Sequence, residues 1–193
     1  MLEQYLKAKN LAHSYGPSPL FSALSFELAP GSVLQITGKN GSGKTTLLQL
    51  LAGIKTCQKG SVHWSEETPY IYIGHQNAIK TELSPLENLY LYQSITSVCA
   101  QALEAMGLER SHHHRPCYML SAGQQRKVAL SRLILTDARV RLLDEPFTAL
   151  DDASKARVTK YLERHAQGGG CAVMAIHERL DIDKSVLRSL VMS

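Results

Sequence analysis

Residues 38–46, with the sequence GKNGSGKTT, match the phosphate-loop pattern G-x-x-x-x-G-K-[ST] without a mismatch. They follow the apolar run 32–37, which is typical of a strand, and precede residues 47–51, which are typical of a helix. A strand, a glycine-rich loop and a helix in this order are the context that the pattern requires. The glycines let backbone N–H groups turn toward an anion at the helix N-terminus. The chain is therefore predicted to bind a nucleoside triphosphate.

Individual residues of this loop have predictable tasks. The Lys44 ammonium is expected to reach the β- and γ-phosphates, and the Thr45 hydroxyl is expected to bind Mg²⁺. The alternative, a glycine-rich turn that precedes a lysine by chance, does not explain the flanking strand and helix. The other nucleotide-binding candidates in the loop are Gly38, Asn40, Gly41, Ser42, Gly43 and Thr46.

Composition excludes several classes of protein. The 193 residues carry a net charge of only +4, from 21 basic and 17 acidic side chains, which indicates an ordinary solvated surface and no nucleic-acid partner. Four scattered cysteines without a C-x-x-C pair favour a reduced, cytosolic compartment. The apolar run 47–54 is too short to span a bilayer, and we expect no leader segment at the N-terminus. Any membrane association is therefore expected to come through a partner.

The order of predicted elements indicates an α/β fold. Short strands are expected at 5–11, 23–28, 32–37, 59–64 and 70–74, and the pattern becomes helical between 84 and 135. A strand at 140–143, a helix at 153–165 and a buried strand at 171–176 follow. We predict one domain over residues 1–193. It has a mainly parallel sheet with flanking helices, a small antiparallel β region, and a helical subdomain at about 77–135 inserted in the α/β core.

A second chemical feature is the sequence LLDEP at 142–146. An apolar strand that ends in Asp144 places a carboxylate at the C-terminal edge of the sheet, where it can hold Mg²⁺. The adjacent Glu145 is expected to orient or deprotonate the attacking water. Arg141 is unusual in a strand that should be buried on both faces, and we expect it to extend to the sheet surface or to pair there.

A third feature is the sequence LSAGQQ at 120–125, in which Ser121 is the predicted N-cap of a helix. The N–H groups of its first turn and the Ser121 hydroxyl form a second phosphate-binding surface. One domain does not need two such surfaces for one triphosphate.

This combination resembles the ABC-type ATPases, which are P-loop NTPases, along nearly the whole chain. The resemblance implies that Ser121 and Gly123 complete the nucleotide site of the opposite protomer. It also implies roles for four further residues. Gln76 would contact Mg²⁺ and the attacking water, and Asp151, in the segment that resembles the family's D-loop, would be a nucleotide-binding residue. His177 would sense the γ-phosphate, and Tyr15 would be the aromatic that stacks on adenine.

Within that superfamily the chain is similar to the haem-exporter ATPases of bacterial cytochrome c maturation (the CcmA family). The matching segments are IGHQ at 73–76, IK at 79–80, LENL at 86–89, LSAGQQRKVAL at 120–130 and LDEPFTALD at 143–151. The resemblance implies a homodimer that uses ATP and Mg²⁺, and integral membrane subunits that handle haem and load or release a periplasmic haem chaperone. It places the protein at the cytoplasmic face of the inner membrane. Arg141 and the abbreviated C-terminus after His177 depart from the family pattern.

Two other functions remain open on the sequence. One is the ATPase subunit of a transporter with another cargo, and the other is a soluble, non-transport ABC ATPase. The histidines at 112–114, with Cys117 nearby, invite a metal or haem site. Because consecutive helical residues point in different directions, we interpret them as a solvated loop instead.

Overall fold

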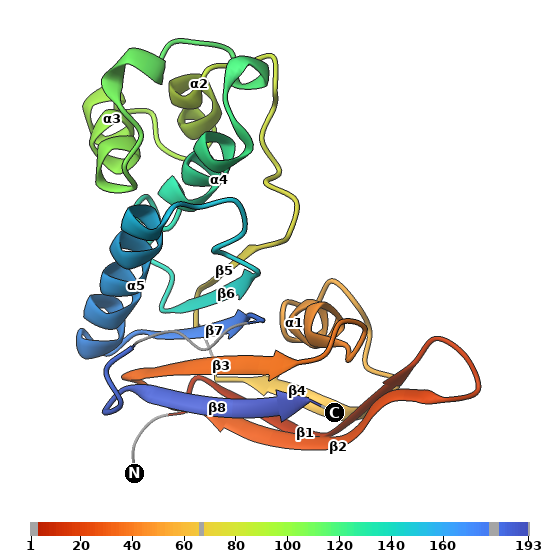
Figure 1. The fold of residues 1–193 in the computed structure, drawn as a ribbon. Helices are drawn as coiled ribbons and strands as arrows, with labels where there is room; N and C mark the ends of the chain where they lie inside the picture. Colours follow the sequence, from red (N-terminus) through yellow and green to blue (C-terminus); the bar gives the residue numbers. More distant parts are fainter. Residues whose placement is uncertain (1–3, 66–67, 178–181, 193) are drawn as a thin grey trace. The chain divides into compact units, whose positions relative to one another are not determined.

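Two compact groups of residues make up the chain, and the structure, a computed structural model, describes residues 4–65, 68–177 and 182–192. The first unit comprises Met1–Tyr72, Ala138–Glu145 and Leu162–Ser193, and the second comprises Ile73–Asp137 and Pro146–Tyr161. Figure 1 identifies the helices and strands of both. In the described part of the chain, no helix is long and apolar enough to cross a membrane.

A five-stranded sheet forms the centre of the first unit, with the strand order β5-β6-β7-β3-β8. The pairs β3–β7, β6–β7 and β3–β8 are parallel. All residues of β6 and β7 are buried, as expected for strands covered on both faces. The parallel arrangement confirms the predicted fold class. The strands are β3 (Ser32–Gly38), β5 (Tyr70–Ile73), β6 (Val140–Asp144), β7 (Cys171–Ala175) and β8 (Leu187–Met192).

A smaller antiparallel sheet, in the order β2-β1-β4, confirms the predicted antiparallel region. Its strands are β1 (Leu6–Ser14), β2 (Pro19–Leu28) and β4 (Lys59–Trp64). The predicted edge strand at 59–64 has the expected bounds. The other two strands are longer than predicted, because the turn between them occupies only the four residues 15–18. Strand β1 therefore ends at Ser14, directly before Tyr15.

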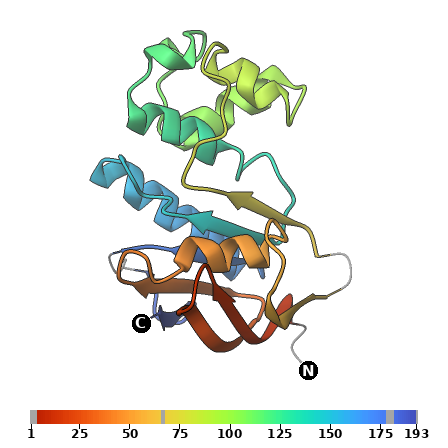
Figure 2. The same ribbon diagram turned by 90° about the vertical axis from the view of Figure 1, so that its right-hand side faces the viewer.

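Helix α1 (Lys44–Leu51) follows the phosphate loop directly and packs on one face of the parallel sheet (Figure 2). Its leucines join a core made by residues of both sheets. Two aromatic side chains hold the carbonyl groups at the C-terminal end of the helix. Trp64 Nε1 donates to the Leu51 carbonyl (3.1 Å), and the Tyr70 hydroxyl donates to the Ala52 carbonyl (3.0 Å). These bonds satisfy acceptors that a helix terminus leaves open.

The second unit is mainly helical, as predicted. Helix α2 (Pro85–Tyr90) and helix α4 (Ala122–Ser131) both begin with a capping box. Helix α5 (Asp152–Gln167) contributes Asp152–Tyr161 to this unit and its remaining residues to the first. Leucine, alanine and cysteine side chains form the core between α2, α3 and α4. The other elements are α3 (Thr96–Ala105) and two short 3₁₀ helices, η1 (Arg110–His112) and η2 (Cys117–Met119).

Strand β8 was not predicted. No strand was expected after the one at 171–176, but Leu187–Met192 adds a parallel edge strand beside β3. Only two of its six side chains, Leu190 and Met192, pack with the main core. An edge strand with this little burial lacks the continuous apolar run by which a central strand is found.

The interpretation of residues 112–114 as a solvated loop is wrong in its main point. His113 is only 3% exposed, and its Nε2 lies 3.1 Å from the Leu108 carbonyl oxygen. His112 ends η1 and contacts Gln124 of α4. Only His114 is exposed.

Arg141 is a buried residue of β6, only 4% exposed, so the expectation that it extends to the surface is wrong. It does pair, but in the core and not at the sheet surface as the alternative expectation had it. Its guanidinium donates to the Ala138 carbonyl and lies 2.9 Å from His165 Nε2, which is also 3.0 Å from the Arg139 carbonyl oxygen. A buried charge is tolerated when hydrogen bonds replace its hydration. Burial, together with the Arg141 charge, lowers the pKa of His165 to about 4.

This His165 environment predicts a pH-dependent stability. His165 takes up a proton near pH 6.5 in the unfolded chain but only near pH 4 in the folded chain. The contribution of the neutral His165 to the free energy of unfolding is therefore fully present above pH 6.5 and is lost as the pH falls toward 4. Because the ring is partly solvated, we expect a loss of about 1 kcal/mol rather than the full value of the shift. Urea unfolding between pH 4 and 8 measures it. The variant His165→Gln should have a flatter profile, and identical profiles would contradict the prediction.

Candidate functional site

The phosphate loop connects the end of β3 to the start of α1. Gly43, the residue before α1, has φ of +95°, which favours glycine, and a Cβ there would lie 2.8 Å from Leu20 and Phe21. A Cβ on Gly38 would lie 2.3 Å from the Met192 carbonyl oxygen of β8. Close packing therefore disfavours side chains at both ends of the loop. The order of β3, loop and α1 confirms the predicted strand–loop–helix context.

Lys44 is the first residue of α1 and is 6% exposed. Its Nζ donates to the Gly38 carbonyl (2.9 Å) and to the Lys39 carbonyl (3.1 Å). The ammonium thus lies inside the curve of its own loop, at the helix N-terminus. The Oγ of Ser42 is buried and makes no hydrogen bond to any residue that the structure describes. Together with the N–H groups of the first helical turn, these two side chains give the loop several donors for one anion.

Thr45 and Asp144 each place an oxygen atom that could bind a metal ion at the same edge of the sheet. Thr45 Oγ1 donates to Asp144 Oδ1 at 3.0 Å, and Asp144, the last residue of β6, is 1% exposed. Mg²⁺ prefers oxygen ligands and is commonly held by one or two protein groups together with substrate phosphates. The chemistry of this donor set fits Mg²⁺.

Glu145 and His177 face each other at the ends of β6 and β7. Glu145 Oε1 lies 2.7 Å from His177 Nε2, and their side chains are 23% and 45% exposed. Glu145 has φ of +49°, and its N–H donates to the Ala175 carbonyl at 2.9 Å. A positive φ at a non-glycine residue directs the carboxylate out of the strand direction. This contact between a carboxylate and a histidine at the sheet edge was not predicted from the sequence.

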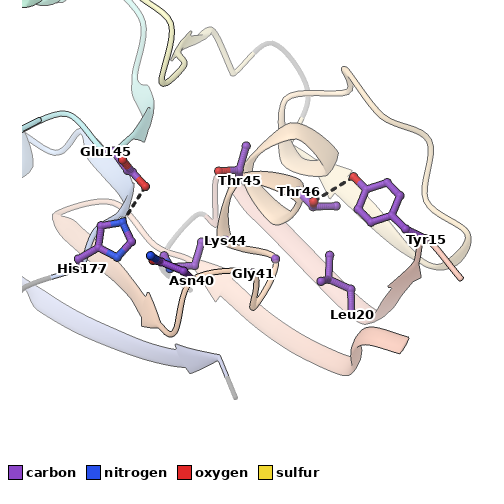
Figure 3. A pocket seen from close by; sticks show the side chains of 10 residues that line it. Tyr15, Leu20, Asn40, Gly41, Lys44, Thr45, Thr46, Glu145 and His177 are labelled. Carbon is purple, nitrogen blue, oxygen red and sulfur yellow. Dashed lines mark hydrogen bonds and ion pairs between the residues drawn. The ribbon is translucent and has the colours of Figure 1, made fainter. Parts of the chain in front are cut away.

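An open cavity of about 590 Å³ joins these groups (Figure 3). Such a volume is in the range of small-molecule sites. Its lining contains most of the residues predicted for nucleotide binding in the first unit, and also Leu20, which the sequence did not indicate. The lining residues are Tyr15, Leu20, Asn40, Gly41, Gly43, Lys44, Thr45, Thr46, Glu145 and His177.

Tyr15 forms one end of this cavity. Its hydroxyl lies 3.1 Å from Thr46 Oγ1, and this hydrogen bond lowers the pKa of Tyr15 despite some opposing desolvation. The ring is 66% exposed and is contacted by Lys55, whose Nζ lies 5.2 Å from the ring centroid. His13 packs edge-on against it at 4.9 Å. Tyr15 is therefore held at its hydroxyl while much of its ring stays accessible. Nothing in the sequence pattern indicated Lys55.

The remaining predicted site residues, Gln76, Ser121, Gly123 and Asp151, belong to the second unit. Ser121 is the N-cap of α4, as predicted, and is exposed. A Cβ on Gly123 would lie 2.4 Å from the Ala149 carbonyl oxygen, so only glycine fits beside the loop 149–151. Gln76 is also exposed.

Asp151 joins α5 to α4. Its Oδ1 accepts a hydrogen bond from Ser154 N–H at 2.7 Å, and its Oδ2 lies 3.5 Å from Lys127 Nζ. The bonds from Ser154 are the main reason that the pKa of Asp151 lies below its usual value, and Lys127 adds to the effect. Asp151 is therefore an ionised group whose position is fixed by the first turn of α5 and by α4.

Two arginines of the α4 region hold the segment that carries Gln76, and sequence reasoning missed both. Arg126, 3% exposed, donates to the Gly74 carbonyl (2.9 Å), to Asn77 Oδ1 (3.1 Å) and to the Pro146 carbonyl (3.3 Å). Arg132 donates to the Asn77 carbonyl at 2.8 Å. Arginine on a helix is usually a surface residue, so only the tertiary contacts distinguish these two.

Comparison with known proteins identifies the family of the chain. The family model described as "ABC transporter" matches residues 21–148. The cytochrome c biogenesis ATP-binding export protein CcmA of Escherichia coli K12 is 41% identical over 96% of this chain and 95% of its own length. An ABC transporter ATP-binding protein from Pyrococcus furiosus has a similar structure, with a TM-score of 0.81 and 23% identity over 96% of each chain.

A dimeric ATP-binding cassette bound to ADP and Pi is also similar, with a TM-score of 0.78, 20% identity, and coverage of 90% of this chain and 88% of that one. The two structural matches support the fold, and the family match and the CcmA relative support membership at the sequence level. The chain therefore belongs to the ABC transporter family of ATP-binding proteins.

Proposed function

We propose that this chain is the ATP-hydrolysing subunit of an ABC transporter complex, a translocase for haem handling or export in cytochrome c biogenesis. The observation that carries the ATPase part is the meeting of Lys44, Asp144, Glu145 and His177 at the C-terminal edge of three adjacent parallel strands. The similarity to CcmA, a cytochrome c biogenesis export protein, supports the role in cytochrome c biogenesis. We further propose one ABC ATPase domain over residues 1–193, with a helical subdomain at about 77–135.

In this proposal the phosphate loop binds the triphosphate of ATP. Lys44 lies where its ammonium can move from two loop carbonyls to the β- and γ-phosphates. Thr45 and Asp144 would hold Mg²⁺, which neutralises charge on the phosphates when bound. Tyr15 offers an accessible ring on which adenine can stack.

Glu145 is the general base of the proposed reaction. Its carboxylate takes the proton of the attacking water, and His177, 2.7 Å away, orients that carboxylate and senses the γ-phosphate. Gln76 contributes a further contact to the water and the metal. Its position depends on the loop that Arg126 and Arg132 hold.

Ser121, Gly123 and Asp151 have a different task, because they complete the nucleotide site of a second protomer. The support is that Ser121 is an exposed N-cap whose helix presents N–H groups to an anion. Two copies arranged head to tail would each supply a phosphate loop to one site and a Ser121 surface to the other.

Mixing two inactive variants tests this arrangement. Ser121→Arg should leave ATP binding by one protomer intact and block ATP-driven dimerisation, and Lys44→Ala should impair its own phosphate loop. In a mixed dimer both substitutions fall on one site and leave the other intact. ATPase activity of the equimolar mixture should reach about a quarter to a half of wild type, because each mixed dimer has one working site of two and at least half of the dimers formed are mixed. A mixture no more active than either variant alone would contradict the composite site.

The proposed contact with the integral membrane subunits lies in the segment between Gln76 and Asn88. Its backbone is held at Lys80, where the Asn88 side chain accepts from the Lys80 N–H (2.8 Å) and donates to the Lys80 carbonyl (2.9 Å). The Lys80 side chain itself is exposed. A cavity of about 230 Å³ lies beside it, lined by Ile79, Leu91, Tyr92 and Arg132 among others. The protein would thus be peripheral, held at the cytoplasmic face of the inner membrane by these subunits.

A further inference from the structure

The contacts of His112 are not explained by the proposed reaction. This residue ends η1, outside the sequence LSAGQQ, yet its Nε2 lies 3.0 Å from Nε2 of Gln124. Gln124 is part of the capping box that begins α4. Its side-chain amide therefore links His112 to Ser121.

The capping box fixes the orientation of the Gln124 amide. Gln124 Oε1 accepts from Ser121 N–H at 2.9 Å, while Ser121 Oγ accepts from Gln124 N–H at 3.2 Å. The Nε2 end of the amide then points to His112. Because an amide nitrogen only donates, the imidazole Nε2 of His112 must accept.

The other side of the His112 ring agrees with this assignment. A neutral imidazole that accepts at Nε2 carries its proton on Nδ1, and Nδ1 lies 3.1 Å from Ser111 Oγ. The Ser111 hydroxyl in turn donates to Glu109 Oε2 at 3.4 Å. The hydrogen bonds from Glu109 through Ser111, His112 and Gln124 to Ser121 thus form one chain, in which each group has a defined donor or acceptor role toward each of its neighbours.

The reversed Gln124 amide is unfavourable in this setting. It would place the NH₂ group against Ser121 N–H, so that two donors face each other and the capping box opens. We propose that His112 is a positioning residue: its neutral imidazole holds the Gln124 amide, and thereby the Ser121 N-cap, in the orientation that binds the partner protomer's nucleotide. This inference rests on the proposed role of Ser121.

A double-mutant cycle tests the proposal in the full-length chain. His112→Leu removes the acceptor, and Gln124→Leu removes the donor. We expect His112→Leu to lower kcat of the ATPase by about three- to tenfold, the effect of one hydrogen bond, with unchanged binding of ATP to the protomer. In the Gln124→Leu background the same substitution should have no further effect. His114→Leu, the exposed neighbour, should behave as wild type.

Rescue distinguishes positioning from general packing. His112→Gln keeps an acceptor of similar reach and should retain most of the activity, whereas His112→Lys, equally long and polar, offers only donors and should not. If His112→Leu lowers the melting temperature, the comparison of His112→Gln with His112→Lys still tests the proposal. Equal activity of the Gln and Lys variants, or equal losses from His112→Leu in both backgrounds, would overturn the inference.

The outcome of Ser121→Arg separates the two hypotheses. Normal ATPase activity in Ser121→Arg would remove the proposed role of Ser121 itself. A loss in Ser121→Arg together with normal His112→Leu would overturn only the role of His112.

Discussion

Replacing Glu145 with glutamine is expected to slow ATP hydrolysis by about 10²- to 10³-fold while ATP binding is retained. The amide keeps the size of the side chain and can still face His177, which lies 2.7 Å from the carboxylate. It cannot accept the proton of the attacking water. ATP should therefore stay bound, and the ATP-loaded dimer should accumulate. Steady-state ATPase assays and size-exclusion chromatography with MgATP measure the two effects.

A matched control for this substitution is Asp152→Asn. Asp152 is a fully exposed carboxylate in the first turn of α5, and its ion pair with Lys155 is 3.5 Å long. Its loss should leave hydrolysis within twofold of wild type, since exposed pairs contribute little. Hydrolysis at the original rate by Glu145→Gln would show that Glu145 is not the general base.

The second large effect is expected at Arg126. Arg126→Met removes donors from the Gly74 carbonyl, from Asn77 Oδ1 and from the Pro146 carbonyl, in a site where the side chain is 3% exposed. Since each buried acceptor left without a donor costs free energy, we expect a loss of about 3 kcal/mol in the free energy of unfolding. The loop that carries Gln76 also loses its anchor, so ATPase activity should fall under conditions where the protein is still folded.

Urea unfolding and ATPase assays at low temperature separate these two consequences of Arg126→Met. The exposed Arg115 provides the control, and Arg115→Met should change neither quantity. Stability and activity both equal to wild type in Arg126→Met would show that the hydrogen bonds of Arg126 do not position this loop.

Local patterns were sufficient to predict much of the site. The phosphate loop depends on residues adjacent in sequence, and the carboxylates of Asp144 and Glu145 follow a strand whose apolar run is plain. The structure therefore shows Thr45 beside Asp144, as expected. The contact of Glu145 with His177 was not itself predicted, although both residues follow parallel strands whose C-terminal ends lie at one edge.

What was missed depends on contacts between segments far apart in the chain. Arg126 lies on the same helix as Ser121, but nothing near it in sequence shows that its guanidinium binds carbonyl groups around Gly74 and Pro146. Arg141 was expected at the surface, since an isolated charge in a strand usually avoids the core, and His165, a distant residue, makes its burial possible. Strand β8 was missed because an edge strand is only partly apolar.

If ATP hydrolysis by this chain supports cytochrome c biogenesis, haem staining of c-type cytochromes in the native host will depend on it. A strain that lacks the gene should contain no mature c-type cytochromes. Wild-type protein should restore them, whereas Glu145→Gln should not. The Lys80 side chain is exposed, while the Lys80 backbone is hydrogen-bonded to Asn88. The variant Lys80→Glu should therefore retain ATPase activity but fail to restore mature c-type cytochromes. Normal c-type cytochromes in the deletion strain, with no related gene compensating, would contradict a role of this ATPase in cytochrome c biogenesis.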